Sequence, residues 1–423
     1  MKKNSKNISL ILFNFILLSA CTQKNNIPGP PFKAKVIQLN LLNASQQRSE
    51  NPTYIFDIAT YSTLTDINKL DGNYFQMILG GELVVKNISG SIITAKSFSG
   101  GNAPLLRYKV KNGAAIPKDY LTAAMLSSYY QFDYLTNNIQ TMTGISLSSI
   151  NAKYGKIKIL FEPKITIESD GSNAEVSGKT NAAYMPTAHQ FLIYQRSAIE
   201  KIPLSSNLQV IAHEFGHAIW EYSFDNGLSQ ECDRISNEYA IRGLNEGFAD
   251  MLSYTQTGST NILKNSLDFN NIAEQRNFSS INFTYDDIYN SNTDTQNNIC
   301  TGSFYCIGTL FAKSLFNAQI NVSTDQTSLT GRSAFMTNIV SALSTTKANM
   351  TQLPTLLNGS DICKVISNSS QSNYNGLILS SFFQSFLSQT AISSNAALQT
   401  AICNNLKANF GGVGFISSAH VGC

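Results

Sequence analysis

Two histidines and a glutamate fall within the five-residue segment HEFGH, at His213, Glu214 and His217. On a helix, side chains four residues apart project from the same face, so both imidazoles can reach one metal ion. Imidazole nitrogens are common zinc ligands, and a glutamate beside them is placed to act as a general base. The spacing therefore predicts a zinc site with the Glu214 side chain close to it.

The sequence around HEFGH predicts an amphipathic helix. Ser206 followed by Gln209 forms a capping-box pattern at its start, and Asn226-Gly227 marks its end. An apolar stripe runs along it at Leu208, Ile211, Ala212, Phe215 and Ile219. The alternative is a pair of structural histidines in a core. The chain has only 4 histidines, and two at this spacing on a capped helix favour a metal site.

A second helix is expected to supply the third ligand that a catalytic zinc requires. Glu246 and Asp250, in the segment LNEGFAD, are four residues apart and share one helix face. One carboxylate can bind the metal while the other accepts a proton from a ligand histidine and fixes its tautomer. A solvated acidic face has the same spacing, but Gly247 between the two carboxylates indicates that another helix approaches closely.

Together these two segments resemble the gluzincin metallopeptidases, in particular the thermolysin-like and fungalysin-like families. Those families pair a His-Glu-x-x-His helix with a downstream Glu-x-x-x-Asp helix. The resemblance implies that His213, His217 and Glu246 bind Zn²⁺ and that Glu214 is the general base.

The resemblance covers about residues 120–320 and extends to groups beside the metal. Asn245 and Asp250 match positions that support the ligand histidines in those families. Asn181 and Ala182 begin the segment NAAY, which is similar to the edge strand that holds an extended peptide substrate. These two residues are therefore expected to bind substrate.

One departure from the family pattern lies in the segment GSFYCIGTLFAKSLF, residues 302–316. This segment resembles a fungalysin helix that carries a catalytic histidine, but Tyr305 stands in that place. A phenol can donate a hydrogen bond to an oxyanion, although a neutral donor stabilises it less than a charged one. His420 could fold back to substitute, but an unstructured tail is the expectation there.

The N-terminal residues 1–20 predict an export signal peptide. Three lysines precede an apolar run at residues 8–18, which is too short to predict a membrane-spanning helix. The segment LSAC that follows resembles the bacterial lipobox, which implies that Cys21 is lipidated and becomes the mature N-terminus. The alternative is an ordinary cleaved signal peptide with an incidental cysteine.

The composition describes an exported globular protein. Of the 423 residues, 43% are hydrophobic and only 13% are charged, so a large core lies behind a weakly charged surface. The signal peptide holds three of the 30 basic residues and none of the 27 acidic ones, which leaves 27 against 27. A neutral chain without a basic run argues against nucleic acid as a partner.

The expected partners are a peptide or protein substrate and a membrane, reached through the lipid on Cys21. The expected location is the bacterial cell envelope. Thr22 is not the aspartate of an inner-membrane retention signal, which favours the outer membrane or the cell surface.

Six cysteines follow Cys21, and an even number in an exported chain predicts up to three disulfides. Their connectivity is open, although Cys300 and Cys306 are close enough along the chain for a local bridge. A cysteine-ligated metal is the alternative, but the chain has no Cys-x-x-Cys pair.

The predicted fold class is α+β, and the resemblance implies the two lobes of a thermolysin-like peptidase. A helix is predicted over residues 118–142, and strands are predicted at 156–161 and 190–194. The expected regions are a signal peptide (1–20), a tether (21–50), a β-rich N-terminal region (51–118), a lobe with the sheet and active-site helix (119–227) and a helical C-terminal lobe (228–423). Whether residues 22–115 form a pro-segment, an inhibitory domain or a permanent lobe stays open.

The predicted function is a zinc-dependent endopeptidase that hydrolyses peptide bonds by Glu214-assisted attack of zinc-bound water. The alternative is a zinc-binding but catalytically silent exported lipoprotein that acts as a binding or scaffold module. Tyr305 motivates this alternative, whereas the intact Glu214 weighs against it, because a binding site needs no base beside the metal. A gluzincin hydrolase with a substrate other than a peptide also stays open.

Overall fold

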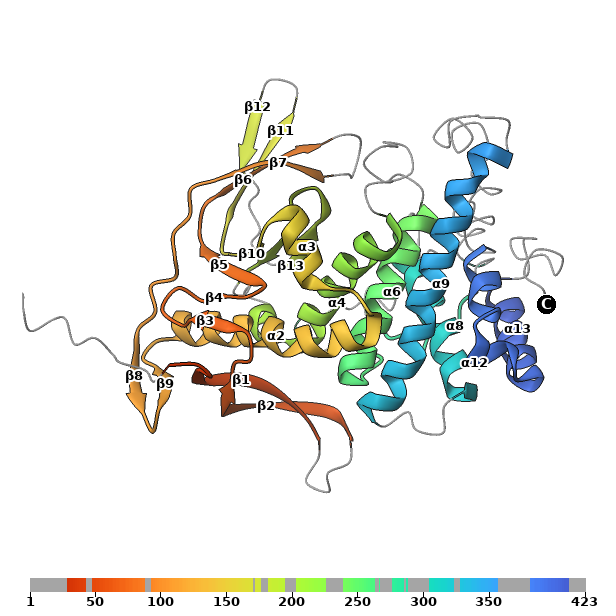
Figure 1. Ribbon diagram of the computed structural model, residues 1–423, viewed down its shortest axis with the longest axis horizontal. Helices are drawn as coiled ribbons and strands as arrows, with labels where there is room; N and C mark the ends of the chain where they lie inside the picture. The colour runs from red at the N-terminus through yellow and green to blue at the C-terminus, as the bar shows by residue number, and fades with distance from the viewer. Residues whose placement is uncertain are drawn as a thin grey trace, which may run out of the picture.

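The computed structural model describes residues 29–42, 48–87, 93–169, 172–175, 182–194, 203–225, 239–262, 266, 276–284, 287, 304–322, 328–356 and 381–410. The fold is mixed α+β, with sheets in the N-terminal part and helices in the C-terminal part (Figure 1), which confirms the predicted class. In these ranges no helix combines the length and the apolar character that a membrane crossing requires.

The bounds of the regular elements are as follows. The strands are β1 (Lys33–Leu42), β2 (Arg48–Thr60), β3 (Leu64–Asp66), β4 (Asp71–Gly72), β5 (Phe75–Leu79), β6 (Glu82–Asn87), β7 (Ile93–Ser99), β8 (Tyr108–Lys111), β9 (Ala114–Pro117), β10 (Ile157–Phe161), β11 (Lys164–Ser169), β12 (Ser172–Glu175), β13 (Ala182–Met185) and β14 (Gln190–Ile193). The α-helices are α2 (Tyr120–Thr143), α3 (Leu147–Tyr154), α4 (Leu208–Trp220), α6 (Tyr239–Thr257), α8 (Phe304–Val322), α9 (Leu329–Leu356), α12 (Thr390–Ser393) and α13 (Ala396–Phe410). Two 3₁₀ turns, η1 (Pro186–Ala188) and η2 (Leu204–Ser206), and a π-helical turn, η3 (Glu221–Asp225), complete the set.

The central sheet has the strand order β13-β14-β10-β5-β4-β3. Strands β5, β10 and β14 are parallel, and β13 runs antiparallel to β14 at the edge. The two strands predicted at residues 156–161 and 190–194 are thus confirmed as β10 and β14. The segment NAAY contributes the edge strand β13, although Asn181 itself lies outside the described residues.

Helix α2 crosses one face of the central sheet and confirms the helix predicted over residues 118–142. Asp119 begins it by accepting a hydrogen bond from a backbone N–H of the first turn, and Gly144 ends it with φ of 69°. The buried ring of Phe132 packs on Phe191 of β14 with centroids 4.7 Å apart. Such aromatic contacts fix the helix on the sheet.

A second sheet, of order β2-β1-β9-β8, covers the opposite side of α2. Figure 1 shows α2 between this sheet and the central one. Ala34, Val36 and Ala59 are buried on the face toward α2. The backbone N–H of Ile37 donates to Ser127 Oγ of α2 at 2.8 Å, which ties the sheet to the helix.

The third sheet, of order β12-β11-β6-β7, packs on the far face of the central sheet. Strand β6 follows β5 after Gly80-Gly81, whose φ angles of 69° and 89° suit glycine and allow the chain to change direction. A small separate core joins the two sheets and contains Leu83, Val85, Leu160, Met185 and Leu192. The central sheet is therefore covered on both faces.

In the C-terminal part, α4 packs on α6, α6 on α8, and α8 on α13. Two of these contacts depend on glycine. A Cβ on Gly216 of α4 would lie 2.5 Å from Ala249 Cα, and a Cβ on Gly247 of α6 would overlap the Gly308 carbonyl of α8. The predicted close approach of another helix at Gly247 is confirmed.

Two of the expected regions need correction. Residues 33–42 and 48–50 belong to strands, not to a tether, because alternate apolar residues of β1 face α2. The boundary expected at residue 118 divides one sheet, since β5 lies between β10 and β4. Residues 1–28, which include Cys21, lie outside the described residues.

Cys306 and Cys403 are both disulfide-bonded. Each is buried within a helix of the C-terminal part. Cys300 lies outside the described residues, so the expected local bridge stays a prediction.

We expect Gly247→Ala to lower the free energy of unfolding by about 1–3 kcal/mol, because the added methyl must displace backbone of α8. In an unconstrained helix the same change would raise the free energy of unfolding by about 1 kcal/mol. The sign of the change therefore shows whether the close contact with α8 is present. Urea unfolding measures it. Gly29→Ala is the control, because no atom lies within 4 Å of that Cβ; equal stability of the two variants would contradict the close helix contact.

Candidate metal centre

Helix α4 carries the HEFGH segment and begins at Asn207. The Asn207 side-chain oxygen accepts a hydrogen bond from the Gln209 backbone N–H at 2.9 Å, and its amide nitrogen lies 2.5 Å from Ser266 Oγ. The capping box predicted from Ser206 is therefore wrong by one residue, since Ser206 ends the turn η2 before the helix. The helix continues from Trp220 into η3, and the predicted stop at Asn226-Gly227 lies outside the described residues.

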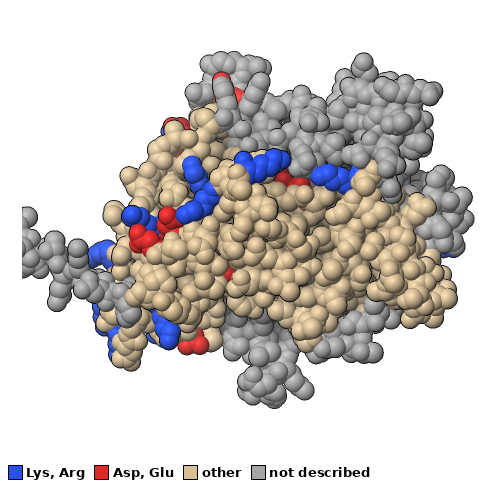
Figure 2. Space-filling view, in the orientation of Figure 1, with Lys and Arg blue, Asp and Glu red and all other residues tan. Residues whose placement is uncertain are grey.

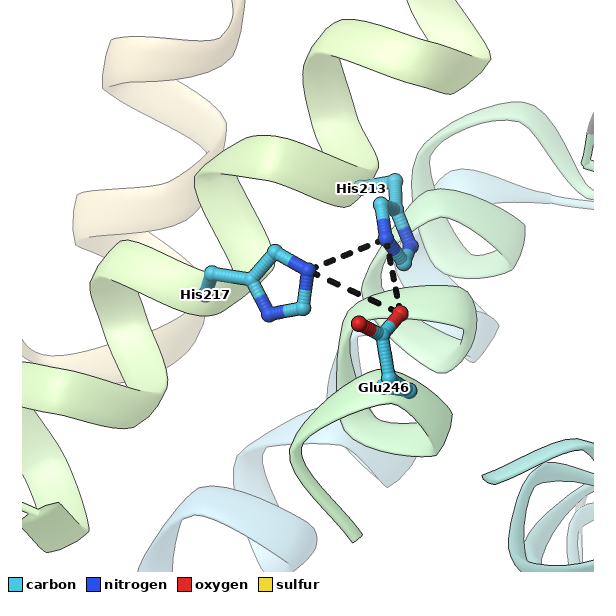
Figure 3. A group of neighbouring side chains, drawn as sticks. All are labelled: His213, His217 and Glu246. Atoms are coloured by element: carbon cyan, nitrogen blue, oxygen red, sulfur yellow. Dashed lines mark hydrogen bonds and ion pairs between the residues drawn. The ribbon is translucent and has the colours of Figure 1, made fainter. Parts of the chain in front are cut away.

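Three donor atoms from two helices meet at this centre. Figure 3 shows both imidazole rings of α4 and the Glu246 carboxylate of α6 pointing toward one another. His213 Nε2 lies 3.1 Å from His217 Nε2 and 3.3 Å from Glu246 Oε2. The third distance, from His217 Nε2 to Glu246 Oε2, is 3.7 Å. Ligands about 2.0–2.1 Å from a tetrahedral zinc are roughly 3.3 Å apart, so these three atoms can hold one metal ion.

Both histidines are held through their other ring nitrogen. His217 Nδ1 lies 2.8 Å from Asn245 Oδ1, and His213 Nδ1 lies 2.9 Å from Asp250 Oδ1. A carboxylate oxygen only accepts hydrogen bonds, so His213 Nδ1 carries the hydrogen in that contact. Each Nε2 is then directed at the other ring and at Glu246, where a cation or an extra proton must separate the lone pairs.

Arg276 is part of this centre, and no motif in the sequence predicted it. Its Nη2 lies 2.6 Å from Glu246 Oε2 and 3.0 Å from Asp250 Oδ1, and its Nε donates to Asp250 Oδ2 at 3.2 Å. The guanidinium carbon also lies 5.1 Å from the centre of the Tyr305 ring. Arg276 comes from a Ser/Asn-rich stretch without helical or strand periodicity, so its place depends on long-range packing alone.

Glu214 is buried next to the donor atoms. Its Oε2 accepts a hydrogen bond from the backbone N–H of Tyr184 in β13 at 2.9 Å. Burial raises the pKa of Glu214 to about 7, and the nearby Glu246 carboxylate acts in the same direction. The carboxyl group thus titrates near neutral pH, and it lies directly against the edge strand.

The pKa values of His213, His217 and Glu246 differ widely. Burial and Arg276 oppose a charge on His213, but hydrogen bonds to Asp250 and Glu246 outweigh them and raise its pKa to about 9. Burial lowers the pKa of His217 to about 4. Burial opposes ionisation of Glu246, yet Arg276 and the two histidines hold its pKa well below its ordinary value. Without a metal, His213 therefore carries the additional proton.

The formal charges favour a divalent cation. Glu214, Glu246 and Asp250 contribute three negative charges when ionised, and Arg276 contributes one positive charge, which leaves −2 with neutral histidines. An unbalanced charge in a buried place is costly. A divalent ion among the three donor atoms brings the cluster to neutrality, as do protons on His213 and Glu214 combined.

The other predicted residues are placed as follows. Tyr305 lies in the first turn of α8, with 40% of its surface exposed, and burial of its hydroxyl together with Glu246 raises its pKa to about 12. Ala182 is buried in β13. His420 lies outside the described residues. A further histidine, His189, is not at the centre and stacks on Tyr154 with ring centroids 3.8 Å apart.

No protein-family model matches the chain, and no curated protein matches it significantly.

We expect the affinity for Zn²⁺ to rise about tenfold per pH unit between pH 7 and pH 9. His213 has a raised pKa of about 9, so below that pH it holds a proton that the metal must displace. Competition with a chromophoric chelator at three pH values measures the slope. Asp250→Asn removes a carboxylate that supports this proton, and its slope should be flatter; a wild-type affinity that does not change with pH would contradict the assignment.

Proposed function

We propose that the chain is a zinc-dependent endopeptidase with a thermolysin-like two-lobe fold. The observation that carries the proposal is the convergence of His213, His217 and Glu246, with a buried glutamate beside them. The contacts of Asn245 and Asp250 with the two rings support it, because metal-binding histidines usually donate their other nitrogen to such partners.

When bound, zinc would supply a Lewis acid that makes water more acidic and polarises a carbonyl group. In the proposed reaction Glu214 takes a proton from the attacking water and delivers it to the leaving amine nitrogen. A pKa of about 7 suits both steps, because the same carboxyl group must accept and donate near neutral pH. The hydrogen bond from Tyr184 fixes one oxygen of Glu214, so the other is the one proposed to meet water.

An extended peptide is the substrate that the edge strand supports best. Strand β13 pairs with β14 along one side only, and the Tyr184 N–H points the other way, toward Glu214. Alternate residues of a strand direct their backbone groups to the same side, so those of Ala182 face the same edge. A substrate that added to β13 as a further strand would run past the catalytic base. Asn181 would begin this binding edge.

Tyr305 is the proposed donor to the oxyanion that forms on the substrate carbonyl. It comes from α8, and Arg276 stacks on its ring beside Glu246. A phenol supplies a neutral hydrogen bond where the resembling families have a histidine. Arg276 adds a positive charge nearby, which favours negative charge in this part of the centre.

The alternative function, a catalytically silent zinc-binding or scaffold module, also has a specific observation in its favour. Arg276 contacts the same Glu246 oxygen that faces the histidines, at 2.6 Å. An arginine in this place can hold the carboxylate by itself, without turnover at the centre. In either case we propose an exported protein, attached to the cell envelope by lipid on Cys21 and without a nucleic-acid partner.

Glu214→Gln should retain zinc and lower peptide hydrolysis by about a hundred- to ten-thousandfold, because the amide cannot accept the proton. Metal content and cleavage of casein or a peptide library are measured together, with a chelator as the control for metal dependence. Glu168→Gln, in the third sheet, is the matched variant and should keep full activity. A zinc-loaded wild type without hydrolytic activity would favour the silent module instead.

Tyr305→Phe should lower kcat by about a hundred- to a thousandfold with little change in KM, since only the oxyanion donor is removed. Tyr305→His should recover activity if the position acts as a donor. Tyr134→Phe, another exposed tyrosine, should behave as wild type. Unchanged kcat in Tyr305→Phe would show that this hydroxyl takes no part in the reaction.

A further inference from the structure

The outer face of the β2-β1-β9-β8 sheet differs from the rest of the described surface. Because residues of a strand alternate between faces, the buried Ala34, Val36 and Ala115 assign the face toward α2. The register then places lysines and apolar residues together on the opposite face. These are Lys33, Lys35, Phe56, Ile58, Lys109 and Lys111. We call this set the basic-apolar face.

The four lysines of this face have no carboxylate within ion-pair distance among the described residues. Other lysines of the N-terminal part do have one: Lys69 pairs with Asp66, Lys156 with Asp71 and Lys164 with Glu82. Figure 2 shows blue groups over β8 and β9 at the lower left of the molecule, with one red group beside them, while the upper part carries further blue and red groups. The mature chain is neutral as a whole, so this face is a local excess of positive charge.

Two large apolar side chains lie beside the lysines of β1. Phe56 is 57% exposed and Ile58 is 44% exposed, both on the edge strand β2. Lys35 pairs across the strands with Ile58, and its Nζ lies 5.8 Å from the centre of the Phe56 ring. An exposed aromatic ring next to a lysine matches the boundary between lipid headgroups and acyl chains, where both kinds of side chain are favourable.

We propose that the basic-apolar face docks on a membrane surface that contains anionic phospholipid. The lysines would lie at the headgroup phosphates, and Phe56 and Ile58 would enter the acyl boundary. The short segment between Cys21 and the sheet supports a membrane as the partner of this face. Lys33 follows Cys21 by twelve residues (33 − 21), which span at most about 40 Å when extended. This sheet is thus the first described element after the expected lipid anchor.

The proposal goes beyond the peptidase function and is independent of it. It also differs from the anchor itself, because it assigns an additional protein surface to the membrane and therefore an orientation. One acyl chain gives only marginal and reversible binding, so a basic surface is the kind of second contact that makes an anchored protein stay bound.

The test uses the whole exported chain with Cys21→Ser, which removes the lipid and leaves the face. Binding is measured by co-sedimentation with vesicles of phosphatidylglycerol and phosphatidylethanolamine, and with vesicles of phosphatidylcholine alone. We expect binding to the anionic vesicles only, with a loss at high salt. Each lysine near such a surface contributes about fivefold to binding, so replacing all four of this face with glutamine should abolish it.

The matched control replaces Lys69, Lys156, Lys164 and Lys407 with glutamine, which changes the net charge equally and should leave binding within a few-fold of the parent. Phe56→Ser, which leaves the charge unchanged, should reduce binding as well. Thermal unfolding of each variant confirms that the fold is intact.

Several outcomes would overturn the proposal. These are equal binding to phosphatidylcholine, retained binding after the four substitutions in this face, or an equal loss in the control. A dimer in solution that Phe56→Ser dissociates would assign the face to a second copy of the chain. Tighter binding to duplex DNA than to the vesicles would assign it to nucleic acid. Loss of peptidase activity in any assay has no bearing on these results.

Discussion

The candidate metal centre brings hydrogen-bond acceptors of His213, His217 and Glu246 face to face in a buried place, and this arrangement constrains the rest of the structure. The His213 and His217 rings use one nitrogen each to contact Asp250 and Asn245. Their remaining nitrogens lie 3.1 Å from each other and 3.3 and 3.7 Å from one oxygen of Glu246. Such an arrangement is stable only when positive charge lies among the acceptors. The helices that carry them must also stay at a fixed separation. Gly216 permits this, since no larger residue fits against Ala249.

The cluster satisfies this constraint in two ways, and they compete. Protons on His213 and the guanidinium of Arg276 supply positive charge from within the protein, whereas a divalent ion supplies it from outside. Arg276 contacts the oxygen of Glu246 that also faces the rings, so the arginine and a metal share this carboxylate. The affinity of the centre for a metal ion therefore depends on whether the Arg276 guanidinium can move away from Glu246. Arg276 is thus the residue that most separates a catalytic centre from a silent one.

Local sequence patterns predicted the centre better than they predicted the fold. The spacing of His213, His217 and Glu246 on two helices follows from helical periodicity, which needs only neighbouring residues. The helix start was misplaced because Asn207, one residue later than Ser206, reaches both Gln209 and a distant Ser266. The cap thus depends in part on tertiary contact.

Other features had no local pattern to reveal them. Arg276 lies 30 residues beyond Glu246 (276 − 246) in a stretch without periodicity, and only packing brings it to the carboxylates. Residues 33–42 were assigned to the tether because they follow the Pro-rich segment 28–31, and the burial of Ala34 and Val36 depends on α2, which lies far along the chain. The pairing of β5 with β10 spans about 80 residues of chain, which no local pattern can specify.

The position of β5 also limits where the chain can be cut without loss of the fold. The N-terminal part of the chain supplies an interior strand of the central sheet. Removing it would expose the unpaired edge of β10 and part of the core around Phe75. An N-terminal cut that leaves the described sheets intact must therefore fall ahead of β1.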